Sequence, residues 1–125
     1  DVEPESGYRY RVDVAGESGT VTLFLTEEKN TPAPKFELSQ NFPNPFNPAT
    51  TIRYSIPERE HVVLDIFDVS GRRVARLVDG VQSAGYHTRK WNGQNAGGDR
   101  VSSGVYFYRL VTGKESMTRK MILLR

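Results

Sequence analysis

The residue types that most often carry out chemistry in proteins are few and scattered in this chain. Cysteine is absent, which excludes disulfides, thiol nucleophiles and zinc bound by cysteine. The two histidines, His61 and His87, stand apart in the sequence, so a catalytic or metal-binding pair would need the fold to unite them with a carboxylate. Glu58 and Glu60 lie beside a proline and are expected to be solvated rather than paired as in a glycosidase. These residues predict a non-catalytic chain that holds no metal and no cofactor.

The stretch 92–99 comes nearest to a metal-binding loop. Its residues, Asn-Gly-Gln-Asn-Ala-Gly-Gly-Asp, combine side-chain oxygens with glycines for sharp bends, as calcium loops do. It contains a single carboxylate, Asp99, and no terminal glutamate that would chelate the ion. We therefore interpret it as a long, glycine-rich hairpin loop.

Aromatic residues offer a second candidate site, a flat platform on which a carbohydrate would stack. Trp91 and the run Tyr106-Phe107-Tyr108 lie in segments that read as strands, which favours places in a hydrophobic core. We expect Tyr86 or Phe107 to be the ring at the surface.

The composition indicates a soluble, globular protein. The chain has 125 residues, of which 37% are hydrophobic and 26% charged, enough for one small domain and an attached piece. Its net charge of +2 is too small for the dense basic face that binds nucleic acid. No apolar run approaches the roughly 20 residues of a transmembrane helix. The acidic start, Asp1 to Glu5, differs from a signal peptide, so we expect any export signal further upstream.

The first two predicted strands form a unit of their own. Residues 8–14 alternate apolar and polar side chains, a turn comes next, and residues 20–26 alternate again, which predicts a β-hairpin within residues 1–28. This hairpin either packs on the later part of the chain or ends a preceding domain. We expect the second, because the approach to its first strand resembles that of fibronectin type III-like domains. Residues 29–35 contain two prolines and no apolar periodicity, and are predicted to be an extended linker.

The segment 36–48 is rich in both proline and phenylalanine. Its prolines exclude a helix or a central strand, whereas its phenylalanines would be costly to expose. We therefore expect Phe36, Phe42 and Phe46 to pin the segment onto the adjoining domain, and Asn44 and Asn47 to cap tight turns.

From residue 50 onward the pattern predicts only β-structure. The predicted strands span 51–56, 62–69, 73–78, 86–91, 104–111 and 115–124. Their length and spacing are typical of an immunoglobulin-like antiparallel β-sandwich of about seven strands, preceded here by the hairpin and the proline-rich linker. Strand 62–69 is apolar on both faces and is expected in the centre of a sheet. Asp68 to Gly71 suits a type I turn, and Gly80 and Gly85 are expected to bracket a loop.

Three stretches of residues 36–125 resemble one family. The first is Asn41-Phe42-Pro43-Asn44-Pro45-Phe46-Asn47-Pro48 with the strand directly after it. The second contains Asp68-Val69-Ser70-Gly71, and the third runs from Trp91-Asn92-Gly93 through Gly104-Val105-Tyr106 to the last residues. In order and spacing they look like the type A C-terminal sorting domain of the type IX (Por) secretion system. They are also similar to the Ig-like domain of the flagellar hook-capping protein. The motif residues of this resemblance are Asn41, Pro43, Asn44, Pro45, Phe46, Asn47, Pro48, Asp68, Gly71, Trp91, Gly104 and Tyr106.

The resemblance implies that residues 36–125 sort a larger exported bacterial protein. In that family the outer-membrane translocon recognises the domain, and a sortase-like protease removes it and attaches the cargo to the cell surface. The implied partners are the translocon, the protease and the upstream cargo of the same chain, with no nucleic acid, on a route through the periplasm to the surface or exterior.

By this analogy the last residues form the recognition element, on an edge strand that would offer backbone groups and side chains to a partner. They are Thr118, Arg119, Lys120, Met121, Ile122, Leu123, Leu124 and Arg125. The alternative is a retained Ig-like accessory module that acts as a spacer, an adhesion domain or a carbohydrate-binding domain of a secreted enzyme.

Overall fold

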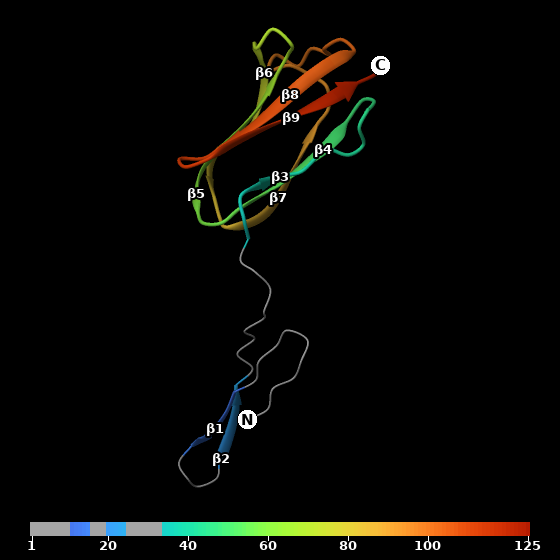
Figure 1. Ribbon diagram of the computed structural model, residues 1–125. Helices are drawn as coiled ribbons and strands as arrows, with labels where there is room; N and C mark the ends of the chain where they lie inside the picture. The colour runs from blue at the N-terminus through green and yellow to red at the C-terminus, as the bar shows by residue number, and fades with distance from the viewer. Residues whose placement is uncertain (1–10, 16–19, 25–33) are drawn as a thin grey trace. The chain divides into compact units, whose positions relative to one another are not determined.

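The structure, a computed structural model, describes residues 11–15, 20–24 and 34–125 (Figure 1). The chain divides into two compact units, Asp1–Ala33 and Pro34–Arg125. In the first unit, β1 (Arg11–Ala15) and β2 (Thr20–Phe24) pair in antiparallel fashion, which confirms the predicted hairpin at these residues. The remainder of that prediction, with linker residues 29–33, lies outside the described residues.

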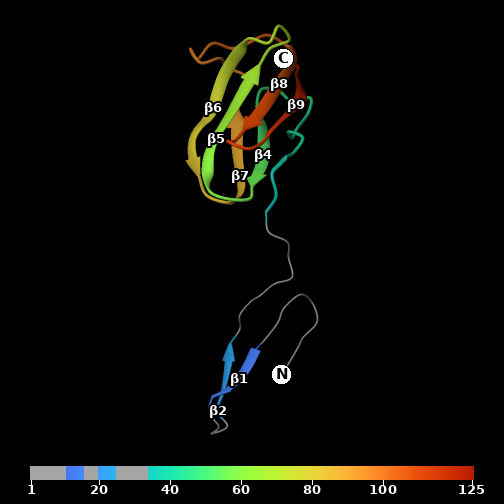
Figure 2. The same cartoon turned by 60° about the vertical axis from the view of Figure 1, so that its left-hand side comes forward.

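The second unit is a sandwich of seven strands in two antiparallel sheets, as the sequence predicted (Figures 1 and 2). The smaller sheet has the strand order β3-β4-β7, formed by β3 (Glu37–Leu38), β4 (Thr50–Ile56) and β7 (Gly85–Trp91). The larger sheet has the order β6-β5-β8-β9, formed by β5 (Glu60–Phe67), β6 (Arg73–Gln82), β8 (Gly104–Val111) and β9 (Ser116–Leu123). The C-terminal strand β9 therefore lies at one edge of the larger sheet, and β5 lies inside it as predicted.

One hydrophobic core fills the space between the sheets. On β4 the alternation buries Ile52, Tyr54 and Ile56. Thr51 and Arg53, which lie between the buried positions or beside them, face solvent. Trp91 is also buried, with its ring centroid 5.8 Å from that of Phe46 and 5.4 Å from that of Tyr106. This packing confirms that Trp91 belongs to the core rather than to a surface platform.

The turn between β5 and β6 is held by one aspartate. The Asp68 carbonyl accepts a hydrogen bond from the Gly71 N–H at 2.9 Å, and its carboxylate accepts others from Ser70 and from the Arg72 N–H. These hydrogen bonds, led by that of the Ser70 hydroxyl, lower the pKa of the Asp68 carboxyl. Gly71 has a φ of +88°, a left-handed conformation that favours glycine. The predicted turn is therefore confirmed.

Two local predictions were wrong. Gly80 does not bracket a loop, because β6 continues past it and pairs with β5 as far as Gln82. Phe42 is 78% exposed instead of pinning its segment, whereas Phe46 is 2% exposed and Phe36 packs against the core. The reason is that Phe42 pairs with Thr51 through both backbone groups, so its ring shares the solvent-facing side of β4 with the exposed Thr51 side chain.

Candidate functional site

The residues predicted for recognition all lie on β9 or directly after it. The side chains of Met121 and Leu123 are fully buried in the core, whereas Thr118 and Lys120 are exposed and Ile122 is half-buried. This alternation is that of a strand with one face on the core and one face on solvent. The structure therefore divides the predicted residues into a structural set and an accessible set.

A distant segment covers the outer edge of β9. We call residues 38–46 the strap. The Phe46 N–H donates to the Ile122 carbonyl and the Leu124 N–H donates to the Phe46 carbonyl, both at 3.0 Å. The Asn44 side chain accepts a hydrogen bond from the Ile122 N–H at 2.9 Å. Asn44 thus binds β9 instead of capping a turn.

Further contacts extend the cover toward the start of β9. The Gln40 side chain donates to the Lys120 carbonyl at 2.8 Å, and the Arg119 guanidinium donates to the Leu38 carbonyl. The expectation of an open row of backbone groups is therefore wrong between Lys120 and Leu124, because the strap already occupies these groups. In this part of β9 a partner can still reach the outward side chains, those of Lys120 and Ile122.

The motif residues hold the strap in shape. Asn41 is 2% exposed and its amide donates to the Pro43 carbonyl at 3.1 Å and to the Thr50 hydroxyl at 2.9 Å. The Thr50 hydroxyl donates in turn to the Pro43 carbonyl at 2.8 Å. Because these polar groups satisfy one another in a buried place, they fix the proline-rich turn above β4.

Tyr108 ties the strap to β8. Its hydroxyl donates to the Ser39 carbonyl at 2.6 Å, and burial raises the pKa of Tyr108 to about 12. On the same strand, the Tyr106 hydroxyl donates to the Ser102 carbonyl at 2.7 Å. Both tyrosines of β8 thus combine core packing with one anchoring hydrogen bond.

The chain ends in an arginine that is bound on three sides. Arg125 donates from its backbone N–H to the Ser103 hydroxyl at 2.8 Å, and from its guanidinium to the Val101 carbonyl at 2.6 Å and the Gly93 carbonyl at 2.8 Å. Gly93 has a φ of +76°, and a Cβ there would lie 2.8 Å from the Arg125 guanidinium and 3.2 Å from the Pro48 carbonyl. Glycine is therefore favoured where Pro48, the 92–101 loop and Arg125 meet.

The two histidines lie on different sheets, and the glycine-rich loop is closed by its own hydrogen bonds. The His61 ring nitrogen lies 2.8 Å from the Asp79 carboxylate on the larger sheet, whereas His87 stacks on Tyr54 with ring centroids 5.3 Å apart. In the loop, the Asn95 side chain accepts hydrogen bonds from the N–H groups of Gly97 and Asp99, both at 2.9 Å. Among the residues that the structure describes, no three histidine, aspartate or glutamate residues gather where they would hold a metal.

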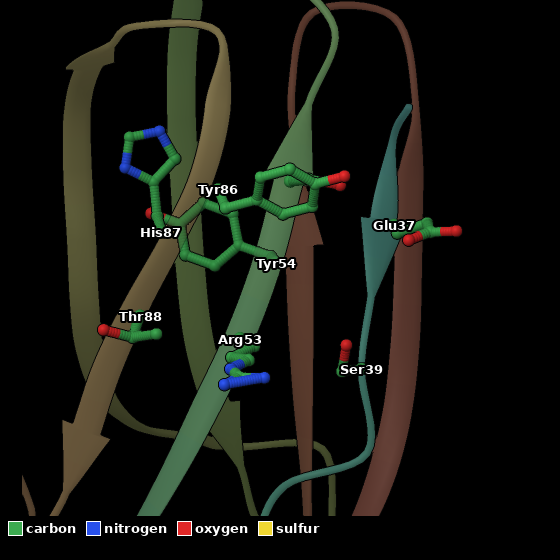
Figure 3. Close-up of a pocket in the computed structure, with 8 residues that line it drawn as sticks. Glu37, Ser39, Arg53, Tyr54, Tyr86, His87 and Thr88 are labelled. Atoms are coloured by element: carbon green, nitrogen blue, oxygen red, sulfur yellow. The ribbon is translucent and has the colours of Figure 1, made fainter. Parts of the chain in front are cut away.

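A hollow lies on the outer face of the smaller sheet, with a volume of about 470 Å³ (Figure 3). Its lining comes from three neighbouring strands and the residue after β3: Glu37, Ser39, Arg53, Tyr54, Ser55, Tyr86, His87 and Thr88. Tyr86 is 77% exposed, as predicted. Burial raises the pKa of Tyr54, whose hydroxyl donates to the Gln82 side chain. Hydroxyls, a guanidinium, a carboxylate and an exposed ring suit binding of a polar ligand rather than bond cleavage.

Sequence reasoning missed the strap contacts and an apolar outer face on the larger sheet. The contact between Gln40 and β9 leaves no local signal, because its partner is 80 residues away. The outer face does leave one, since the strand 104–111 is apolar at nearly every position rather than at every second one.

The comparisons with known proteins agree with this fold. Residues 48–116 match the family described as the FlgD Ig-like domain. The structure resembles dimeric latent PorU from Porphyromonas gingivalis, with a TM-score of 0.60, 20% identity and coverage of 83% of this chain and 12% of PorU. It also resembles PorZ, described as an essential surface component of the type-IX secretion system of the same organism, with a TM-score of 0.50, 21% identity and coverage of 97% of this chain and 15% of PorZ.

FlgD from P. aeruginosa aligns with a TM-score of 0.48 and 23% identity, over 59% of this chain and 58% of FlgD. The chain therefore spans less than two thirds of each of these proteins. No curated protein matches its sequence. Within the described residues, no helix is long and apolar enough to cross a membrane.

Proposed function

The chain belongs to the FlgD Ig-like domain family, and from this premise we propose that it is a non-catalytic sorting signal at the C-terminus of a larger exported protein. The observation that carries the proposal is the last strand. β9 is held by the core and by the strap, yet it presents Thr118 and Lys120 to solvent. A recognition element benefits from this arrangement, because a pre-ordered strand loses little entropy on binding.

The fold shared with PorU and PorZ supports a type IX secretion context. In this proposal residues 1–28 end a preceding domain, residues 29–35 are the linker accessible to a sortase-like protease, and residues 36–125 are the sorting domain. The partners are the outer-membrane translocon, the protease and the upstream cargo. The protein passes through the periplasm to the cell surface or the exterior.

The test is a display assay. The whole chain is fused to the C-terminus of a periplasmic reporter in a bacterium that has the type IX machinery, and in the same strain without its translocon. We expect surface display or release of the reporter only with the chain and the translocon together. A deletion of Lys120 to Arg125 is a poor control, because it also removes the buried Met121 and Leu123. A reporter fused to an unrelated Ig-like domain is a better one, and equal periplasmic retention of both fusions would reject the sorting role.

A second candidate function rests on the hollow of the smaller sheet. Its exposed Tyr86 ring beside Arg53, Thr88 and Glu37 is a suitable surface for a carbohydrate, which stacks its apolar face on a ring and bonds its hydroxyls to polar neighbours (Figure 3). This function predicts glycan binding by the isolated chain on a glycan array, and its loss in Tyr86→Ala. Display in the reporter assay, with no binding on the array, would favour sorting.

A further inference from the structure

The outer face of the larger sheet is unusually apolar for a surface. Cross-strand pairing places Phe67 beside Phe107 and Phe107 beside Lys120, and it places Val105 beside Ile122. Their neighbours in sequence, Tyr106, Tyr108 and Met121, are buried in the core, so this set points outward. The four apolar members are only half-buried. We call Phe67, Val105, Phe107, Thr118, Lys120 and Ile122 the docking face.

A second hollow lies on this face. Its volume is about 260 Å³ and its lining includes Phe67, Val69, Phe107, Arg109 and Thr118. Val69 is 73% exposed at its rim, although it is a large apolar side chain. An exposed apolar patch with a depression in it is a common property of protein-binding surfaces.

The charge that surrounds the docking face is positive. The carboxylates on this side of the sheet and at the hollow are already bound. Asp65 accepts hydrogen bonds from Arg76 at 2.8 and 3.1 Å, and Asp79 pairs with His61 and Arg76. Asp68, which also lines the hollow, accepts hydrogen bonds from the Ser70 hydroxyl and the Arg72 N–H. By contrast, Arg109 and Lys120 form no ion pair within the described part of the chain, and the Arg109 guanidinium lies 4.7 Å above the Phe67 ring. A complementary partner therefore carries carboxylates around an apolar contact.

The strap restricts how a partner protein can bind β9. The backbone groups of β9 between Lys120 and Leu124 are bonded to the strap, so adding a partner strand there would require the strap to leave. The outward side chains of β9 need no such rearrangement, and they continue directly into the apolar residues of β8 and β5.

We propose that the export partner binds the docking face, through an apolar contact rimmed by carboxylates, and not the backbone edge of β9. This inference rests on the proposed sorting function. It assigns recognition to Thr118, Lys120 and Ile122 together with Phe107 and Phe67, and it leaves Met121 and Leu123 a structural role.

The molecule supplies a matched control. The tripeptide Thr-Arg-Lys occurs at 118–120 on β9 and again at 88–90 on β7, with the Thr and Lys side chains exposed in both. The double variant Thr118→Glu/Lys120→Glu reverses the charge of the docking face, and Thr88→Glu/Lys90→Glu makes the same chemical change on the other sheet. In the display assay we expect the first variant to lower surface display at least tenfold and the second less than twofold. Lys120→Arg keeps the charge and should display normally, and thermal unfolding of each purified chain checks that it is folded.

The accessibility of the docking face is measured first. Because the chain has no cysteine of its own, a cysteine introduced on this face is its single reactive thiol. Lys120→Cys and Lys90→Cys should react with a maleimide at similar rates in the full chain. A much slower reaction at position 120 would show that another part of the chain covers the docking face. A dimer in light scattering that Thr118→Glu/Lys120→Glu dissolves would assign the face to a second copy. Either result overturns the proposal.

The assay separates the two levels of inference. If the unmodified fusion is not displayed, the sorting function fails and this proposal fails with it. If the unmodified fusion is displayed and both double variants are displayed equally well or lost equally, the sorting function stands and the docking face is wrong.

Discussion

The edge strands β7 and β9 carry the same three residues, Thr-Arg-Lys, followed in each case by a buried residue, Trp91 or Met121. Their surroundings differ. On β7 the Arg89 guanidinium donates to the carbonyl of its own neighbour, Thr88. On β9 the Arg119 guanidinium donates to the Leu38 carbonyl, 81 residues away in the sequence. The arginine of the tripeptide thus bonds to its own strand on β7, whereas on β9 it bonds to the strap.

The outer faces beside the two tripeptides differ as well. Lys90 and Thr88 stand opposite the polar residues Thr51 and Arg53 of β4. Lys120 instead stands opposite Phe107. The comparison teaches that the contacts of a short basic motif depend on the segments that the fold brings beside it. For the tripeptide of β9 these are the strap on one side and the apolar residues of β8 on the other.

The largest effect is expected when the strap loses its core anchor. Phe46→Ala removes a ring that is 2% exposed and packs on Trp91, so we expect the free energy of unfolding to fall by about 3–5 kcal/mol, measured by urea denaturation. The change would also make the edge of β9 resemble that of β7. The matched control is Phe42→Ala, four residues earlier in the same segment. Its ring is 78% exposed, so we expect a change within about 0.5 kcal/mol. Equal effects of the two variants would show that the strap does not depend on Phe46.

A smaller effect is expected when a single strap contact is removed. Asn44→Ala deletes the acceptor of the Ile122 N–H and should destabilise the domain by about 1 kcal/mol, while the Ile122 amide should exchange its hydrogen faster. The amides of β7 should be unchanged, which sharpens the contrast between the two edges. Asn47→Ala, at an exposed position of the same segment, is the control. An unchanged Ile122 amide would mean that the strap does not close this edge in solution.

The sequence predicted the sheets better than the strap, and the reason is physical. The alternation in β4 and the turn chemistry of Asp68 are local, so the residues themselves reveal the strand and the turn. The strap depends on partners far apart in the sequence: Asn44 with Ile122, and Tyr108 with Ser39. The pattern did indicate that phenylalanines hold the segment, but it could not distinguish Phe46 from Phe42. That difference depends on which distant strand each residue pairs with, β9 for Phe46 and β4 for Phe42.

Recognition residues were predictable only as a stretch. Family resemblance indicated residues 118–125, and alternation on a strand separates the buried Met121 and Leu123 from the exposed Thr118 and Lys120. Nothing local to β9 reveals that its backbone edge is closed, since the side-chain hydrogen bonds between β9 and the strap join residues that are 78 to 81 positions apart in the sequence.

The smallest effect we expect is a pH dependence of the free energy of unfolding between pH 8 and pH 10. Two tyrosines contribute to it: Tyr108, which bonds the strap, and Tyr54 on the smaller sheet. Burial raises the pKa of Tyr108 from 10.0 to about 12 and also raises the pKa of Tyr54. The folded state therefore keeps both hydroxyls protonated up to a higher pH than the unfolded state does. The resulting stabilisation is complete at pH 8 and is lost as the pH rises through 10 toward 12. Over the first part of this range, from pH 8 to pH 10, the loss stays below about 1 kcal/mol.

Tyr108→Phe isolates the part that belongs to the strap. The variant also loses the hydrogen bond to Ser39, so it starts from a lower free energy of unfolding at pH 8. Its stability should then fall less steeply with pH than that of the unmodified chain, because the raised pKa of Tyr108 no longer contributes. Urea denaturation midpoints at pH 8, 10 and 11 measure the two slopes, and the other titrating groups cancel in their difference. Parallel slopes would mean that the Tyr108 hydroxyl ionises as easily in the folded chain as in the unfolded one, and that the strap does not bury it.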